Sequence, residues 1–223
     1  MDYNHNRRYF ENSKVPMYIS IGLGVFGLLL FAGGEVGVIL GLLFIAGGGA
    51  VFYFLDYKKR ISDEELDRIC ESQIRDLKTE ALNKLGIDED EVNEAGHFQV
   101  SCYDYDARGT LNKKGKDGVW RSSQYKTDIF FFSRDVAHCF TRSFSIIKNE
   151  QRDSTEEYFY RDIVSVKVAE NERKDQVCGE YVELTTTAGT VFKFAFRKSE
   201  ADKVSRSING MRNLLKDKKQ TMA

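Results

Sequence analysis

Two long apolar segments stand near the start of the chain. Residues 15–32 and 36–55 contain no charged side chain. As helices of about 18 and about 20 residues they would measure roughly 27 and 30 Å. Both lengths match the hydrocarbon core of a bilayer, so the pattern predicts two transmembrane helices.

The connection between the two segments is too short for anything but a reversal of the chain. It consists of Gly33, Gly34 and Glu35, so we expect an antiparallel hairpin. A cleaved signal peptide is the alternative for the first segment, but that segment is long and a second one follows at once. A buried hairpin of a soluble protein is also disfavoured, because both segments are apolar on all faces.

Basic residues predict the orientation of this hairpin. Three precede the first span and three follow the second, whereas the turn carries no cation: Arg7, Arg8, Lys14, Lys58, Lys59 and Arg60. Positive charge stays on the cytosolic side of a membrane. We therefore expect a two-pass protein of the plasma membrane with both termini in the cytosol.

Small residues recur at four-residue steps within the spans. Ser20 and Gly24 lie in the first, and Gly37 and Gly41 follow Gly33 into the second. Small side chains let helix backbones approach closely. The spacing predicts packing within the hairpin, or a face for self-association or for a partner's helix. Neither span holds an ionisable residue, which disfavours pumps and channels.

An acidic amphipathic helix is predicted after the hairpin. Ser62 and Glu65 have capping-box spacing, and Gly86 is placed to end the helix. The apolar stripe between them consists of Cys70, Ile74, Leu77, Ala81 and Leu85. It predicts either packing on the domain that follows or a short coiled-coil dimer.

From His97 onward the pattern alternates, which is typical of half-buried antiparallel strands. We expect strands at 98–102, 120–126, 129–132, 137–147, 157–160, 163–169, 181–187 and 191–196, with a turn at Ala188-Gly189. Many short strands in series indicate a barrel or sandwich. After Ser199, a possible N-cap, helical spacing returns in Ala201, Val204, Ile208, Met211 and Leu215, and predicts a helix that covers the open end of a small barrel.

These patterns divide the chain into five parts. We expect a cytosolic N-terminal tail (1–14), a transmembrane helical hairpin (15–57), an acidic linker helix (58–95), a β domain (96–217) and a short tail (218–223).

The β region resembles the bacterial pleckstrin-homology (PH)-like domains. The resemblance covers roughly residues 97–216, and it rests on residues 127–132, 158–166, the hairpin at 181–196 and the last helix. It implies a mainly antiparallel PH-like barrel with a C-terminal capping helix. Such family members are often fused to membrane helices and mostly lack a defined activity. The chain differs from that family in two ways. It lacks the spacing of basic residues that phosphoinositide-binding members carry in their first hairpin, and its tryptophan, Trp120, lies outside the last helix.

A basic segment is the best candidate for a ligand contact. Between Arg108 and Lys126 stand six cations and one acid. We expect Lys113, Lys114, Lys116 and Arg121 to contact anionic lipid headgroups, with a solvated loop as the alternative. The net charge of the whole chain is −1, which disfavours nucleic acid as a partner.

Catalytic and metal-binding motifs are missing from the sequence. No glycine-rich phosphate loop, GxSxG or HExxH occurs, and His138 and Cys139 are strand neighbours that point to opposite faces. The four cysteines form no CxxC pair, so we expect reduced cytosolic thiols instead of disulfides or a metal site. The chain is therefore expected to be no enzyme and to need no cofactor.

Together these features predict a membrane-anchored, non-enzymatic binding or scaffold module that presents a PH-like domain at the cytosolic membrane face. Its expected partners are membrane lipids and a membrane protein or a second copy of the chain. The alternative is an oligomerising membrane effector or pore-forming protein whose cytosolic domain senses a trigger. A third hypothesis is an accessory subunit of a transporter or of an envelope-synthesis complex.

Overall fold

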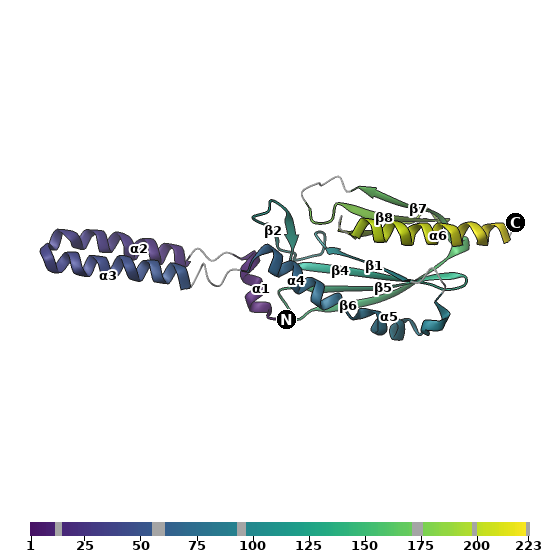
Figure 1. Ribbon diagram of the computed structural model, residues 1–223, viewed down its shortest axis with the longest axis horizontal. Helices are drawn as coiled ribbons and strands as arrows, with labels where there is room; N and C mark the ends of the chain where they lie inside the picture. The colour runs from purple at the N-terminus through teal and green to yellow at the C-terminus, as the bar shows by residue number, and fades with distance from the viewer. Residues whose placement is uncertain (12–14, 55–60, 93–96, 171–175, 198–199, 222–223) are drawn as a thin grey trace. The chain divides into compact units, whose positions relative to one another are not determined.

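The computed structural model describes residues 1–11, 15–54, 61–92, 97–170, 176–197 and 200–221. It divides into two compact units, one formed by Asp2–Leu66 and the other by Asp67–Ala223 together with Met1. Figure 1 shows the elements of both units in chain order, and each unit is described by itself.

The N-terminal tail forms a short helix, α1 (Tyr3–Phe10). Asp2 caps this helix, because its side chain accepts a hydrogen bond of 3.0 Å from the backbone N–H of His5. The hydroxyl of Tyr9 donates to Asp63 over 2.7 Å, and both side chains are buried. These contacts order a segment in which the sequence predicted only a tail.

Two apolar helices follow and lie side by side (Figure 1): α2 (Val15–Leu30) and α3 (Gly34–Phe52). The short 3₁₀ segment η1 (Phe31–Gly33) joins them, and Gly34 turns the chain with φ of 75°. By length and composition alone, the helical stretch Met17–Phe52 is able to cross a membrane. The predicted cations Lys14, Lys58, Lys59 and Arg60 lie outside the described residues.

Small residues bring the backbones of α2 and α3 together. A Cβ atom on Gly27 would lie 2.7 Å from the carbonyl oxygen of Gly41, and one on Gly41 would strike that of Gly27. A Cβ atom on Gly37 would strike the carbonyl of Leu30. A Cβ atom on Gly48 would lie 3.0 Å from the carbonyl oxygen of Ser20 and 3.7 Å from the amide of Gly24. Of the predicted helix-packing residues, Gly37 and Gly41 lie at the close approach and Ser20 contributes its carbonyl oxygen, whereas a Cβ atom on Gly24 would meet open space.

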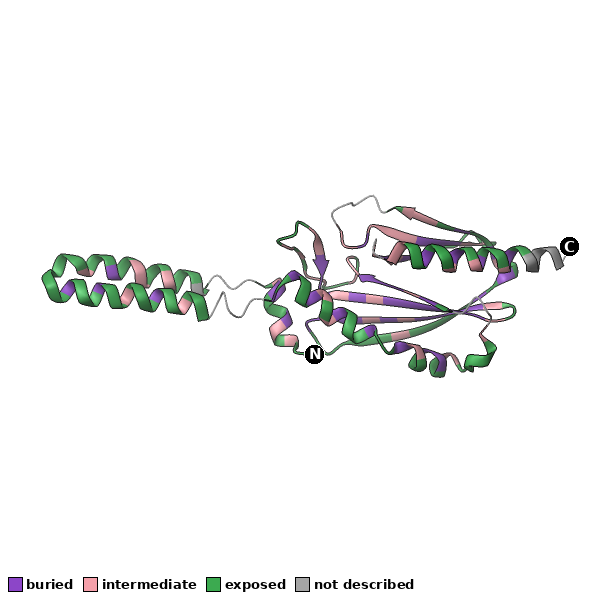
Figure 2. Ribbon diagram, viewed as in Figure 1, coloured by how far each residue is buried: buried purple, intermediate pink, exposed green. Residues whose placement is uncertain are grey.

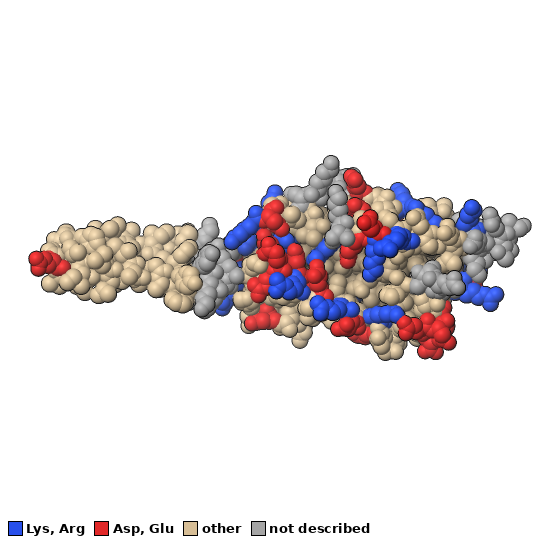
Figure 3. All heavy atoms as spheres, in the orientation of Figure 1, with Lys and Arg blue, Asp and Glu red and all other residues tan. Residues whose placement is uncertain are grey.

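The outward faces of this helix pair are apolar and exposed (Figure 2). The exposed fraction reaches 70% at Leu29, 69% at Val36 and 63% at Leu43. Glu35 is the one charged residue between positions 15 and 54, and the helix pair is otherwise free of charge in Figure 3.

The predicted linker helix is broken into α4 (Asp63–Ile74) and α5 (Leu77–Leu85). The Ser62 hydroxyl accepts the Glu65 N–H over 3.1 Å, and Gly86 ends α5 with φ of 69°, as the sequence predicted. From Asp67 on, both helices pack on the β domain. Cys70 Sγ lies 3.8 Å from the Tyr103 hydroxyl, and an ion pair of 2.5 Å joins Lys84 to Asp153. The stripe is thus used within the domain, and no coiled coil is needed to bury it.

The domain contains a four-stranded antiparallel sheet in the order β1 (His97–Tyr103), β4 (Gln124–Phe132), β5 (Val136–Ser145), β6 (Gln151–Phe159). In the chain segment that links β1 to β4, the strands β2 (Asn112–Lys114) and β3 (Trp120–Ser122) pair with each other as a separate two-stranded ribbon. A 3₁₀ turn, η4 (Tyr160–Asp162), leads to a three-stranded antiparallel sheet of β7 (Ile163–Glu170), β8 (Glu180–Thr186) and β9 (Val191–Phe196). Helix α6 (Ala201–Thr221) completes the domain.

One core lies between the two sheets and α6. Phe130 of β4 meets Phe194 of β9 edge-to-face, with 4.8 Å between ring centroids, and Val204 and Ile208 of α6 are fully buried beside them. The predicted antiparallel strands and final helix are therefore present. The predicted closed barrel is not, because the described strands form separate sheets.

Several strands differ from the prediction. The predicted strands 120–126 and 129–132 are instead the short β3 (Trp120–Ser122) and one continuous β4 (Gln124–Phe132). β6 begins at Gln151 instead of residue 157. The earlier start was missed because the first half of the strand is polar and mostly exposed, without apolar alternation. β2 was not predicted, since its three residues Asn112–Lys114 are polar. The turn at Ala188-Gly189 is confirmed, with Gly189 at φ of 76°, whereas Ser199 lies outside the described residues.

Candidate functional site

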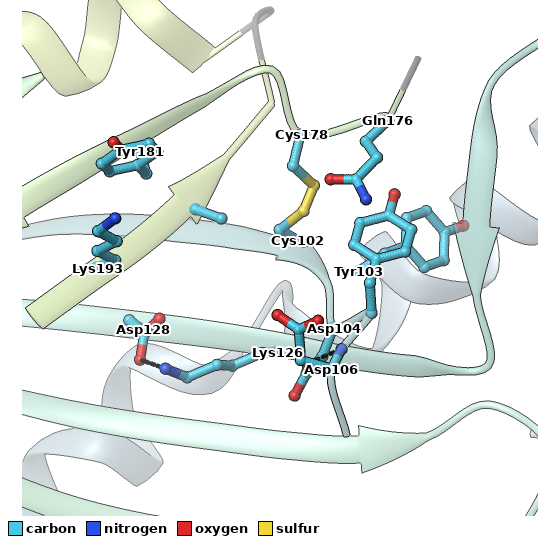
Figure 4. Close-up of a pocket in the computed structure, with 12 residues that line it drawn as sticks. Cys102, Tyr103, Asp104, Asp106, Lys126, Asp128, Gln176, Cys178, Tyr181 and Lys193 are labelled. Atoms are coloured by element: carbon cyan, nitrogen blue, oxygen red, sulfur yellow. Dashed lines mark hydrogen bonds and ion pairs between the residues drawn. A yellow bond between two sulfur atoms is a disulfide. The ribbon is translucent and has the colours of Figure 1, made fainter. Parts of the chain in front are cut away.

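A cleft of about 470 Å³ opens at one end of the two sheets (Figure 4). Its walls come from the end of β1 and the residues that follow it, from β4, and from β8 and β9. On β4 the core positions Phe130 and Phe132 give way along the same face to the polar Lys126 and Asp128, which line the cleft. The cleft is therefore a polar continuation of the apolar core.

An ion pair with a buried carboxylate lies on the floor of this cleft. Lys126 Nζ is 3.3 Å from Asp128 Oδ1, and the Thr141 hydroxyl donates to the same carboxylate over 2.5 Å. Asp128 is only 2% exposed. Burial raises the pKa of its carboxyl, and the Lys126 ammonium opposes that shift.

Further charged groups line the walls. Asp104 and Asp106 belong to the turn after β1, where the Asp106 N–H donates to Asp104 Oδ1 over 3.1 Å. On the opposite wall the Lys193 ammonium lies over the Tyr181 ring, 4.8 Å from its centroid. Three carboxylates and two ammonium groups thus share the cleft.

Two tyrosines that line the cleft, Tyr103 and Tyr105, have hydroxyls that donate to other parts of the protein. Tyr103 donates to Asp67 over 2.6 Å, and Tyr105 donates to the carbonyl oxygen of Trp120 over 2.7 Å. Burial raises the pKa of both phenols. The rings of Tyr103 and Tyr105 therefore form fixed parts of the cleft wall.

A disulfide joins Cys102 to Cys178 in the wall of the cleft, with 6.0 Å between the Cα atoms (Figure 4). This corrects the prediction that all four cysteines are reduced thiols. The prediction holds for Cys70 and Cys139, which are free and buried. Burial raises the pKa of Cys70 to about 12.

The predicted lipid contacts lie elsewhere, on the β2–β3 ribbon. Lys114 and Lys116 are exposed and Lys113 is half-buried. Arg121 is 3% exposed and forms two-pronged pairs with Asp67 at 2.9–3.0 Å and with Asp117 at 2.7–3.0 Å. Arg121 is thus a structural cation, and its predicted role as a lipid contact is not compatible with this burial.

The neighbouring residues His138 and Cys139 do not come together as one site. His138 and Cys139 do point to opposite faces, since Cys139 belongs to the core whereas His138 Nδ1 lies 3.4 Å from Glu157. No group of three His, Cys, Asp or Glu side chains among the described residues is placed to hold a metal ion.

The sequence carried partial signals for the cleft. Lys126 and Asp128 stand two apart in a strand, which puts them on one face. Their pairing was missed because one predicted strand ended at Lys126 and the next began at Ile129, which left Asp128 outside both. Cys102 and Cys178 are 76 positions apart in the chain, and a pairing over that distance leaves no local signal.

No protein-family model matches this chain. Comparison with curated proteins gives no match either.

Proposed function

We propose that this chain is a membrane-anchored, non-enzymatic binding module. In this proposal α2 and α3 cross the plasma membrane as a hairpin and hold a PH-like domain at the cytosolic face. One observation carries it: the helix pair exposes apolar side chains on its outward faces, up to 70% at Leu29, and has no charge except Glu35 at its turn. Such a surface is stable in lipid and costly in water.

The orientation rests on charge. Cations flank the hairpin on both outer ends and are missing from its turn. Both termini and the β domain are accordingly cytosolic in this proposal. Tethering then keeps the domain at high effective concentration near headgroups and membrane proteins.

The cleft supplies the binding surface for a small ligand. Asp104 and Asp106 favour an ammonium group, whereas Lys126 and Lys193 favour a phosphate or carboxylate, and the tyrosine rings provide flat walls. The ligand class is therefore a zwitterion. The exposed Lys114 and Lys116, with the half-buried Lys113, remain the proposed contacts with anionic headgroups.

Two experiments test this function. Full-length protein should stay in the membrane pellet after alkaline carbonate washing, and a C-terminal tag should become protease-sensitive only when cells are permeabilised. Recovery in the soluble fraction, or a tag that is accessible on intact cells, would contradict the anchor or its orientation.

Ligand binding is tested with the full chain in detergent. Phosphoethanolamine is the zwitterionic probe, and glycerol phosphate, an anion of similar size without an ammonium group, is the comparison. Phosphoethanolamine should bind more tightly by calorimetry, and Asp104→Asn should weaken that binding while the distant Asp90→Asn should not. Equal binding of both probes would refute a zwitterion site.

One observation supports the alternative function, an oligomerising membrane effector. Cβ atoms on Gly47 and Gly49 of α3 would meet open space, so these glycines are not used within the pair. They offer a face for a second copy, as an oligomerising effector requires. Cross-linking in membranes distinguishes the two functions, because a large oligomer that Gly47→Leu abolishes would favour the effector.

A further inference from the structure

The Cys102–Cys178 bond connects the two sheets of the domain. Cys102 is the last residue but one of β1, and Cys178 lies two residues before β8 begins. The Cα separation of 6.0 Å falls within the range of ordinary disulfides. The native fold therefore brings these two thiols within bonding distance.

A permanent disulfide at this point conflicts with the proposed cytosolic placement. Disulfides persist in oxidising compartments, whereas cytosolic thiols are kept reduced unless the bond is transient or redox-sensing. The same domain also keeps Cys70 and Cys139 as unpaired, buried thiols. A disulfide that forms and breaks reversibly would agree both with the short distance between the two cysteines and with the cytosolic placement that the basic residues predict.

The position of the pair makes exchange feasible. Both cysteines are nearly buried, at 3% and 1% exposure, yet both line the cleft, through which a small thiol or disulfide can approach. Cys70 and Cys139 do not line it. Burial also raises the pKa of both, so little of their reactive thiolate forms.

We propose that Cys102 and Cys178 form a reversible dithiol–disulfide site that exchanges with low-molecular-weight thiols and disulfides through the cleft. In oxidation, the thiolate of one cysteine attacks an external disulfide such as oxidised glutathione, and one external thiol leaves. The thiol of the second cysteine then loses its proton and attacks the mixed disulfide, which closes the protein bond and releases the second external thiol. Two electrons pass from the protein to the external disulfide.

Contacts other than the disulfide also hold the segment that contains Cys178. The backbone of Gln176 bridges to Trp120, and the Tyr105 hydroxyl holds the Trp120 carbonyl. Neither contact involves a sulfur atom, so we expect the domain to stay folded when the bond opens.

The inference rests on the cytosolic placement proposed above, and thiol counting in cells tests it. Cells that express the full chain are quenched in acid, and thiols are tagged with a maleimide polymer after denaturation. Four tags are expected in untreated cells, and two after treatment with diamide, a permeant thiol oxidant. In the Cys70→Ser/Cys139→Ser variant, diamide should still remove two tags, so that the count falls from two to none. In Cys102→Ser and in Cys178→Ser, diamide should not change the number of tags.

In vitro, the oxidised fraction of the unmodified protein should follow the two-electron dependence on glutathione, rising from about one tenth to about nine tenths over a roughly hundredfold change in [GSSG]/[GSH]². This measurement needs no variant, so a misfolded serine variant does not spoil the test.

Three results separate the possible failures. A pair that stays reduced after diamide refutes the exchange site and leaves the orientation intact. A pair that is oxidised in untreated cells, with the C-terminal tag protected, makes the bond structural and overturns the inference alone. The same oxidised pair with an externally accessible tag overturns the proposed orientation as well.

Discussion

Arg121 illustrates how the surroundings of a side chain decide its role. It stands in the most basic segment of the chain, but its guanidinium is buried between Asp67 of α4 and Asp117 of the β2–β3 turn. Its hydrogen bonds lower the pKa of Asp117. The side chain therefore ties the ribbon to the helix, and the neighbouring lysines keep the surface role.

Replacing Arg121 with alanine should destabilise the domain strongly. It removes the two-pronged partner of both carboxylates and leaves Asp67 with the longer ion pair of 3.8 Å to Arg197, so the free energy of unfolding should fall by about 3 kcal/mol. The measurement is urea unfolding of the full chain in detergent, followed by the fluorescence of Trp120, the only tryptophan. Lys114→Ala is the matched control and should change stability by no more than about 0.5 kcal/mol. Equal effects of the two variants would contradict the structural role.

Asp153 should make the stability depend on acidity. Hydrogen bonds from Arg142 lower the pKa of this carboxyl to about 2. Because the folded pKa lies below the unfolded one, the stabilisation is complete above about pH 5 and is lost as the pH falls toward about 2. Asp153→Asn should flatten this part of the profile in urea unfolding at stepwise pH. The neighbouring Ser154→Ala should keep the original slope, and an unchanged slope in Asp153→Asn would refute the assignment.

Among the helices, the contact between α2 and α3 depends on a few glycines. A side chain at position 41 would strike the Gly27 carbonyl and the Phe31 ring, whereas one at position 47 meets open space. The small-residue spacing predicted this contact, but it did not distinguish inward from outward glycines. That distinction depends on the rotation of each helix, which spacing alone leaves open.

Gly41→Ile should therefore disrupt the helix pair, and Gly47→Ile should not. We expect the Gly41 variant to lose helical signal at lower temperature in detergent and to accumulate less in membranes, because the backbones must separate to admit the side chain. Thermal circular dichroism and membrane yield are the two measurements. Identical behaviour of the two variants would show that the close approach is not needed.

Strong periodicity predicted most elements, and weak periodicity accounts for the misses. The apolar stripe of α6 and the alternation of β7, β8 and β9 gave correct elements. The first half of β6 is polar and exposed, so it had no alternation to detect. The break between α4 and α5 was also missed, because the apolar stripe continues across it.

In the protein as a whole, the sequence predicted the apolar and β parts but not the cleft. The cleft assembles the end of β1, part of β4, Cys178 and the β8–β9 pair, which are far apart in the chain. Local patterns describe one segment at a time, so they do not reveal a site that only the packing of two sheets creates. The same limit explains why Cys102 and Cys178 were predicted to be free.

The link between these cysteines should stabilise the domain as a unit. A bond between residues 76 apart restricts the unfolded chain, and the chain-entropy model gives about 4 kcal/mol for such a loop. Urea unfolding of the full chain in detergent should therefore show a higher midpoint for the oxidised than for the reduced protein. The Cys102→Ser/Cys178→Ser variant should match the reduced protein under both conditions. Equal midpoints for oxidised and reduced protein would mean that the bond adds no stability, because native strain or residual unfolded structure cancels its effect.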